Sequence, residues 1–263
     1  MTEDQMTSAA AEPQDSPVRV INPEGAGRVV LICEHASYHI PSLYNGLGLD
    51  PQDRMSHAAW DPGAFDVSMR LSATLDAPLV AATVSRLVYD CNRAPDVASA
   101  MPAQSEKVTV PGNRDLSATD REARARAVYE PFCKAVDNVL DQRPPDTVVV
   151  TIHSFTHIFH GTPRAVEIGL LHDTDTRLAD AMLADANVLL PHRRVERNAP
   201  YGPEDGVTHS LRLHALSRQM SNVMVELRND LLLGNTQVQT MADEVLILLK
   251  PALAQLYPEG ETT

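Results

Sequence analysis

The chain has 263 residues, of which 43% are hydrophobic and 22% charged, and its net charge at pH 7 is −13. This length is enough to bury a full core in one large domain or two small ones. The acidic balance argues against general nucleic-acid binding, which needs clustered lysines and arginines. No apolar run approaches the ~18 residues of a membrane span, so we expect neither nucleic acid nor a membrane as a partner.

The chain begins with MTEDQMTSAAAEPQDSP, which is polar and acidic and lacks the apolar segment of a secretory signal. We expect disordered tails at 1–17 and 258–263 around a single catalytic domain at 18–257. The three cysteines, Cys33, Cys91 and Cys133, contain no CxxC pair. This argues against a disulfide framework and a thiolate zinc site, and it favours a reducing, cytoplasmic location.

Six apolar runs predict strands: 28–33, 77–84, 87–91, 146–153, 165–172 and 222–227. Five further segments predict helices: 61–75, 119–142, 174–188, 207–219 and 236–256. The first helix begins with Asp61 as a candidate N-cap before a proline, and the second with a T-D-R-E capping box at Thr119. Strands that alternate with helices predict an α/β fold with a mostly parallel sheet.

Polar residues occur at the carboxyl ends of the predicted strands. Glu34 and His35 follow the first strand, His153 ends the fourth, and Glu226 lies near the end of the last. Ligands of open α/β sheets bind at this edge, and two histidines with carboxylates there favour a metal site. Each residue also has a structural alternative. Either histidine could be a satisfied buried residue, Asp61 only a helix cap, and Glu226 a partner in an ion pair.

Arginine at the same edge favours binding of a substrate carboxylate. Asn92 and Arg93 follow the 87–91 run and open a long loop, 92–118, while a second long loop covers 196–207. A guanidinium group binds a carboxylate at two points, and a chain of this charge needs such local groups to attract an acidic substrate. Alternatively, Arg93 pairs with Asp90 or Asp61 and only braces the loop.

Six short segments, taken together, resemble the N-formylglutamate amidohydrolase family. They occur in order across residues 32–232: ICEHAS, HAAWDPGA, SRLVYDCNR, TIHSF, NAPYGPEDGVTH and VMVELRNDLL. The family is similar in fold to the zinc carboxypeptidases and aspartoacylases. The resemblance therefore implies a phosphorylase/hydrolase-like α/β fold, with a mostly parallel mixed sheet and helices on both faces.

The resemblance also implies roles for individual residues. The two histidines of the zinc site map onto His35 and His153, and the general base maps onto Glu226. The pair that holds a substrate carboxylate maps onto Asn92 and Arg93.

One departure from the relatives leaves the carboxylate ligand open. Their HxxE motif is absent, because Tyr38 stands three residues after His35. Asp61 is the first choice, since it opens a helix after a loop from the first strand. Glu34 is the second, because neighbouring strand residues point to opposite faces.

The implied reaction is zinc-dependent hydrolysis of the N-formyl or N-acyl amide of a small amino-acid substrate. The family's named reaction converts N-formyl-L-glutamate to formate and glutamate. Arg86 or Arg93 would stabilise the oxyanion while the other binds a carboxylate, and Asn198 and Tyr201 are candidate substrate contacts. The alternatives are a metallo-carboxypeptidase or amidase acting on a peptide or cell-wall substrate, and a non-catalytic carboxylate-binding protein. No sequence feature sets the oligomeric state.

Overall fold

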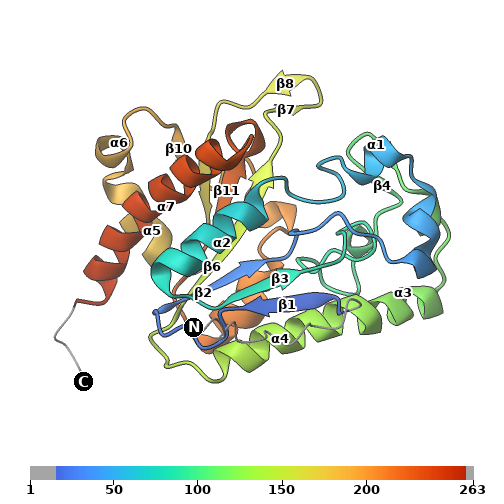
Figure 1. Ribbon diagram of the computed structural model, residues 1–263, viewed down its shortest axis with the longest axis horizontal. Helices are drawn as coiled ribbons and strands as arrows, with labels where there is room; N and C mark the ends of the chain where they lie inside the picture. Colours follow the sequence, from blue (N-terminus) through green and yellow to red (C-terminus); the bar gives the residue numbers. More distant parts are fainter. Residues whose placement is uncertain (1–15, 259–263) are drawn as a thin grey trace, which may run out of the picture.

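The computed structural model describes residues 16–258, so the predicted tails lie almost entirely outside the described residues. Seven strands form one sheet in the order β1-β3-β2-β6-β11-β9-β10 (Figure 1). Their bounds are β1 (Val18–Ile21), β2 (Val29–Cys33), β3 (Leu79–Ala82), β6 (Val148–Phe155), β9 (Ile168–Leu171), β10 (Val195–Arg197) and β11 (Asn222–Arg228). The four central strands are parallel, whereas β1 and β9 run antiparallel to β3 and β11. The predicted mostly parallel α/β sheet is confirmed.

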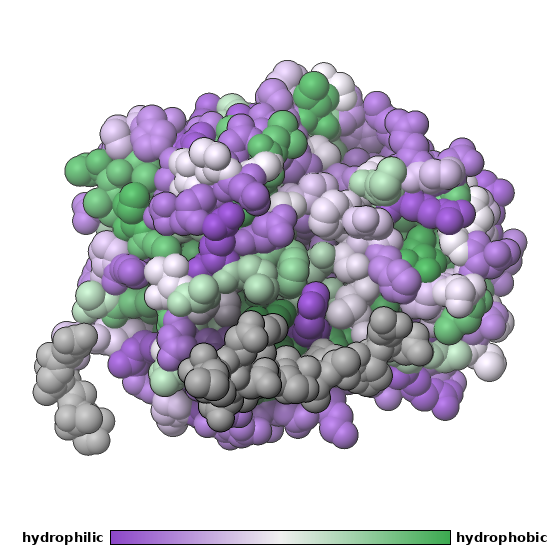
Figure 2. Space-filling view, in the orientation of Figure 1, coloured by the Kyte–Doolittle hydropathy of each residue, from purple (hydrophilic) through white to green (hydrophobic). Residues whose placement is uncertain are grey.

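Helices cover both faces of the sheet (Figure 1). The helices of the chain are α1 (Pro51–Arg54), α2 (Ala64–Leu75), α3 (Ala118–Arg124), α4 (Glu130–Leu140), α5 (Arg177–Ala184), α6 (Ala186–Leu189) and α7 (Asn235–Leu256). Helices α2, α5 and α7 pack on one face, and α4 packs on the other. None of the helices within residues 16–258 combines the length and apolar character that a membrane crossing needs. Hydrophilic residues cover much of the molecular face in view, with hydrophobic residues in smaller groups (Figure 2).

The continuous apolar strands arise because both faces of the sheet are buried. In β2, Leu31 belongs to the core under α2, α5 and α7, while its neighbour Ile32 belongs to the core under α4. The same alternation in β6 separates Val150 from Val149. Cys33 and Cys91 are free, buried thiols in these two cores, as the sequence indicates.

The predicted strand at 87–91 is wrong, because this buried segment forms turns. The backbone amide of Val88 donates to the carbonyl of Ser85, and that of Asp90 donates to Ala100. The Leu87 carbonyl accepts a hydrogen bond from the Asn113 side chain. The polar backbone groups are thus satisfied without a strand ladder, so an apolar run can be buried here without being a strand.

Two predicted helix starts are also corrected. The N-cap of α2 is Gly63, and the Asp61 side chain points elsewhere. The capping box of α3 is formed by Ser117 and Asp120, two residues before the predicted start at Thr119, with reciprocal bonds of 3.1 Å.

The helix predicted at 207–219 differs in type. It contains a π-helical turn at Leu211–Ala215 followed by a 3-10 turn at Leu216–Arg218.

The sequence also contains short strands that its pattern did not predict. β1 and β10 add the two sheet edges. The long loop at 92–118 contains the hairpin β4 (Gln104–Ser105) with β5 (Val108–Thr109). A second hairpin, β7 (Ile158–Phe159) with β8 (Thr162–Pro163), follows β6. Strands of two to four residues are too short for an alternating pattern to identify them.

Gly169 in β9 allows the 198–201 segment to lie against the sheet beside Glu226. Gly169 is the register partner of Glu226 in the antiparallel pair β9 and β11. A Cβ atom at this position would lie 1.8 Å from the carbonyl oxygen of Ala199. The backbone of the 198–201 segment therefore occupies the space that a side chain would need.

We expect Gly169→Ala to displace this segment, because moving backbone costs more free energy than rotating a flexible side chain. The cost should be about 1–3 kcal/mol of stability, as for other overpacked sites. That corresponds to a fall in Tm of several degrees for a chain of this size, at roughly 2–4 °C per kcal/mol, and thermal unfolding measures it. An unchanged Tm would show that the segment is not held against β9.

Candidate metal centre and active site

Three adjacent parallel strands bring the predicted site residues to one edge of the sheet. His35 lies two residues beyond β2, while His153 and Glu226 lie in β6 and β11 as direct register partners. His153 therefore does not end its strand. It pairs with Glu226 of β11, and β6 continues to Phe155. All three side chains are buried. The expectation that these strand ends meet at one edge is confirmed.

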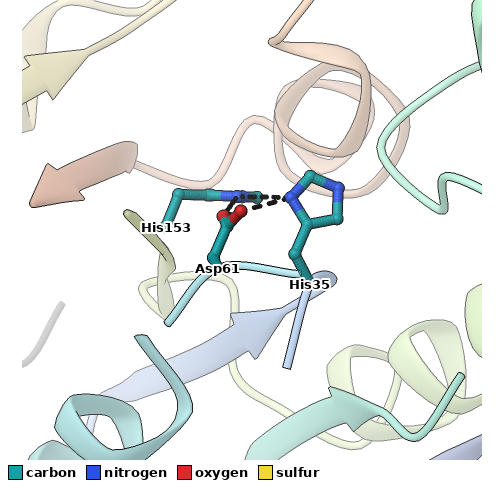
Figure 3. Close-up of side chains that lie close together, drawn as sticks. All are labelled: His35, Asp61 and His153. Carbon is teal, nitrogen blue, oxygen red and sulfur yellow. Dashed lines mark hydrogen bonds and ion pairs between the residues drawn. The ribbon is translucent and has the colours of Figure 1, made fainter. Parts of the chain in front are cut away.

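His35, Asp61 and His153 point their polar atoms at one another (Figure 3). The Oδ2 atom of Asp61 lies 3.1 Å from Nδ1 of His35 and 3.0 Å from Nδ1 of His153. The two Nδ1 atoms are 3.1 Å apart. These three atoms form a nearly equilateral triangle, called the His-Asp-His triangle below.

The loop between β2 and α2 places Asp61 in this triangle. The backbone amide of Asp61 donates to the carbonyl of His35 at 3.0 Å. Its carboxylate accepts from the backbone amide of Ser154 at 3.2 Å and from Nη1 of Arg86 at 3.1 Å. The interpretation of Asp61 as a helix cap is therefore wrong, because its side chain faces the histidines.

A buried carboxylate lies behind each histidine. Asp90 Oδ1 is 2.7 Å from Nε2 of His35, and Glu34 Oε2 is 3.1 Å from Nε2 of His153. Such carboxylates commonly orient metal-bound histidines and select their tautomer. Glu34, the second choice for a metal ligand, thus lies on the far side of His153 from the triangle.

The residues of the triangle fit a metal ion in both type and spacing. Two imidazoles and one carboxylate are a donor set that zinc takes in catalytic sites. Tetrahedral zinc with bonds of about 2.0–2.1 Å places its ligands about 3.3 Å apart, close to the spacing found here.

The charge around the triangle also fits a bound metal ion. Four carboxylates are buried there: Glu34 and Asp61 are each 1% exposed, Asp90 is 4% exposed and Glu226 is 5% exposed. Within residues 16–258, Arg86 is the only lysine or arginine that pairs with any of them. Buried carboxylates are costly without compensating positive charge, and a divalent cation would supply it.

The pKa shifts show that this region stabilises positive charge. Burial alone would lower the pKa of His153, but Glu34 and Asp61 hold that pKa well above its ordinary value. Burial would raise the pKa of Asp61, but His35, His153 and Arg86 hold it well below the usual range. The field that retains a proton on an imidazole also attracts a metal cation, which displaces that proton on binding.

Glu226 has the environment of a general base. It is 5% exposed, and its Oε2 atom has no hydrogen-bond partner among the described residues. Burial raises the pKa of Glu226 to about 7, with His153 opposing the shift and Asp61 adding to it. A catalytic base is most effective when its pKa lies near the working pH.

These groups line a cavity of about 750 Å³, which is within the range of small-molecule sites. The predicted residues that line it are His35, Asp61, Arg86, Asn92, Arg93, His153, Tyr201 and Glu226. Asn198 is not in the cavity lining, and its side-chain oxygen accepts a hydrogen bond from the backbone amide of His172 at 2.9 Å. The structure therefore does not support Asn198 as a substrate contact.

Asn92 and Arg93 have different surroundings. Both ends of the Asn92 amide bind backbone, at 2.6 Å to the Val207 carbonyl and 3.0 Å from the Ser210 amide nitrogen. Asn92 therefore anchors the 207–210 segment. Arg93 donates from Nη1 to the carbonyl of Asn92 at 2.8 Å and forms no ion pair with any described residue. The alternative in which Arg93 pairs with Asp90 or Asp61 is not observed.

Two further residues of the cavity were not selected from the sequence. His57 lies 2.7 Å from the Ser154 carbonyl and 3.0 Å from Glu106. Its position four residues before Asp61 was a usable signal. The other residue is Arg164, whose guanidinium carbon lies 4.2 Å from the Phe159 ring centroid. No local pattern marked Arg164, because it precedes β9, and the sequence pattern does not show that this strand runs antiparallel to β11.

The chain was compared with known proteins. The family model of N-formylglutamate amidohydrolase matches residues 27–233. Gene product Atu2144 from Agrobacterium tumefaciens has 50% sequence identity and a TM-score of 0.89, covering 92% of this chain and 96% of its own. N-formylglutamate amidohydrolase from Ralstonia eutropha JMP134 has 18% identity and a TM-score of 0.68, covering 90% of this chain and 97% of its own, which supports the fold. No curated protein matches the chain. The family match covers most of the sheet and every residue of the His-Asp-His triangle, and the chain belongs to the N-formylglutamate amidohydrolase family.

Proposed function

We propose that this protein is a zinc-dependent amidohydrolase that converts N-formyl-L-glutamate, or a closely related N-acyl amino acid, to the free amino acid and the acid of the acyl group. The observation that carries the proposal is the His-Asp-His triangle beside Glu226, within a cavity large enough for such a substrate. The family supports a hydrolase of this class. The metal and the substrate are our assignments.

His35, Asp61 and His153 would hold the zinc ion, which supplies Lewis acidity toward the amide carbonyl and toward water. A hydrogen bond with Asp90 orients the His35 ring through its Nε2 atom, and the Glu34 carboxylate forms an ion pair with Nε2 of His153. Arg86 fixes Asp61 through its Oδ1 atom, which leaves Oδ2 directed at the histidines.

Glu226 would move the protons of the reaction. Its carboxylate accepts a proton from the attacking water, and the resulting acid then donates that proton to the departing nitrogen. A group that ionises near pH 7 can perform both transfers, because neither its acid nor its base form is strongly disfavoured. Burial of Glu226 also keeps bulk water from taking the proton.

Arginine groups would bind the negative charges of the substrate. Arg86 contacts Asp61 and Asp90 through its two Nη atoms and also lines the cavity. A guanidinium has five N–H donors, so these contacts leave donors for the developing oxyanion. Arg93 lacks a carboxylate partner among the described residues and would hold the carboxylate of the amino-acid substrate.

Hydrolysis itself is tested with the zinc-loaded protein and a panel of N-formyl, N-acetyl and N-succinyl amino acids, by measuring release of free amine. We expect turnover of N-formyl-L-glutamate and slower or no turnover of bulkier acyl groups. Absence of amine release across the panel would contradict the proposed reaction and favour a peptide substrate or a binding protein.

Removing one ligand of the triangle should remove the metal. We expect His153→Ala and Asp61→Asn each to lose bound zinc and hydrolytic activity, because two ligands hold the ion much less tightly than three. Elemental analysis of purified protein measures the zinc content. His192→Ala, which changes an exposed histidine that pairs with Glu244, is the matched control and should keep about one zinc per chain. Full zinc occupancy in either triangle variant would exclude that residue as a ligand.

Glu226→Gln should separate catalysis from stability. The amide cannot accept a proton, so we expect kcat to fall by roughly 10² or more, with little change in zinc content.

In metal-free protein the same Glu226→Gln change should increase stability at pH 8. The carboxyl pKa rises from 4.5 in the unfolded chain to about 7 in the fold, so folding is disfavoured progressively as pH rises through this window.

The expected gain for metal-free Glu226→Gln at pH 8 is about 1–3 kcal/mol, and it should vanish near pH 4, where the carboxyl is protonated in both states. Urea unfolding at the two pH values measures it. A gain that is the same at both pH values would indicate that ionisation of Glu226 is not its source.

A further inference from the structure

Three arginines line the cavity, and among residues 16–258 only one of them forms an ion pair. Arg86 pairs with Asp61 and Asp90, at 3.1 Å and 3.3 Å. Arg93 and Arg164 form no ion pair with any residue in the range 16–258, although the protein carries a net charge of −13. Unpaired guanidinium groups in the wall of a cavity, within an acidic protein, indicate that the ligand supplies the missing negative charge.

The surroundings of Arg164 restrict its guanidinium while using few of its donors. The guanidinium carbon lies 4.2 Å from the ring centroid of Phe159 and 4.8 Å from that of Tyr201. Its side chain makes one long hydrogen bond, 3.4 Å to the Thr156 carbonyl. Contact with the faces of two aromatic rings restricts the planar group and leaves N–H donors available to a carboxylate.

The backbone of Arg164 is also fixed relative to the catalytic strand. Its amide donates to the His157 carbonyl at 2.8 Å, and its own carbonyl accepts from Nη1 of Arg228 at 3.2 Å. Arg228 ends β11, two residues after Glu226. The position of Arg164 is therefore tied to the strand that carries the proposed base.

Arg93 and Arg164 lie on different segments of the cavity wall. Arg93 lies three residues after Asp90, which contacts His35 directly. Arg164 directly follows β8, and Phe159 and Thr162 of the β7–β8 hairpin line the cavity with it. Arg93 thus belongs to the segment that touches the triangle, and Arg164 to the part of the cavity formed by the hairpin.

We propose that Arg164 is a specificity-determining residue that binds the side-chain carboxylate of the substrate, while Arg93 binds the α-carboxylate. This inference rests on the proposed function. The α-carboxylate and the scissile nitrogen are attached to the same carbon atom. The α-carboxylate must therefore lie near the triangle, where the Arg93 segment is. The side-chain carboxylate extends several bonds further and reaches the hairpin. Phe159 and Tyr201 then act by orienting Arg164.

The test uses zinc-loaded protein and three substrates: N-formyl-L-glutamate, N-formyl-L-glutamine and the α-amide of N-formyl-L-glutamate. The two amides each replace one carboxylate at nearly constant size. We expect wild type to prefer N-formyl-L-glutamate over either amide by about ten-fold or more in kcat/KM, since a charged two-point contact is lost in each case.

Arg164→Met should abolish the preference for N-formyl-L-glutamate over N-formyl-L-glutamine. It should leave unchanged the preference for N-formyl-L-glutamate over its α-amide. Arg93→Met should do the reverse. Arg164→Lys should restore part of the glutamate preference, because lysine keeps the charge but not the planar fork. If Arg164→Met does not fold, as judged by its Tm, Arg164→Lys provides the same comparison of substrates.

Arg126→Met is the matched control, since this arginine is 58% exposed on its helix and pairs with Glu122. It changes the net charge equally and should leave both preferences as in wild type. Equal losses on N-formyl-L-glutamate and N-formyl-L-glutamine in Arg164→Met would overturn the assignment.

Failure of the proposed function would be seen separately, as a lack of turnover by wild type on all three substrates. Calorimetric binding of L-glutamate and L-glutamine to the zinc-loaded protein then tests Arg164 without catalysis. Stronger binding of glutamate that disappears in Arg164→Met supports the assignment. Stronger binding of glutamate that persists in this variant overturns it.

Discussion

The concentration of buried negative charge at one edge of the sheet is the constraint on which the site depends. Glu34, Asp61, Asp90 and Glu226 are removed from water beside two histidines, and Arg86 compensates only part of their charge. A buried carboxylate costs several kcal/mol unless it is paired, so this arrangement is stable only with further positive charge. The raised pKa of His153 favours its protonated form in the metal-free protein, and a bound divalent cation would supply positive charge more strongly.

The same constraint explains why the groups behind the histidines are carboxylates. Asp90 and Glu34 each face the Nε2 atom of a histidine, which directs the Nδ1 atoms toward Asp61. Removal of either carboxylate would leave a ring free to rotate or to change its tautomer. The residues around the triangle therefore contribute as much to its geometry as the three candidate ligands do.

At Glu226, the stability of the fold and the proposed catalytic role are opposed. A carboxyl group kept apart from hydrogen-bond partners, with its pKa raised to about 7, destabilises the fold wherever it is ionised. The surrounding strands tolerate this cost because both faces of the sheet are packed against helices. The close approach of Ala199 to Gly169 brings the 198–201 segment, whose Tyr201 lines the cavity, against β9, the strand next to β11.

The sequence by itself determined the central architecture and pointed to part of the candidate site. Long apolar runs predicted the central strands, and the rule that ligands bind at their carboxyl ends brought His35, His153 and Glu226 together. Tertiary structure decided the rest, because each remaining feature depends on residues far apart in the chain. The loop geometry turned the Asp61 side chain toward the two histidines instead of the helix start. The antiparallel direction of β9 placed Arg164 in the cavity, since a strand's direction depends on its neighbour and leaves no mark in its own pattern.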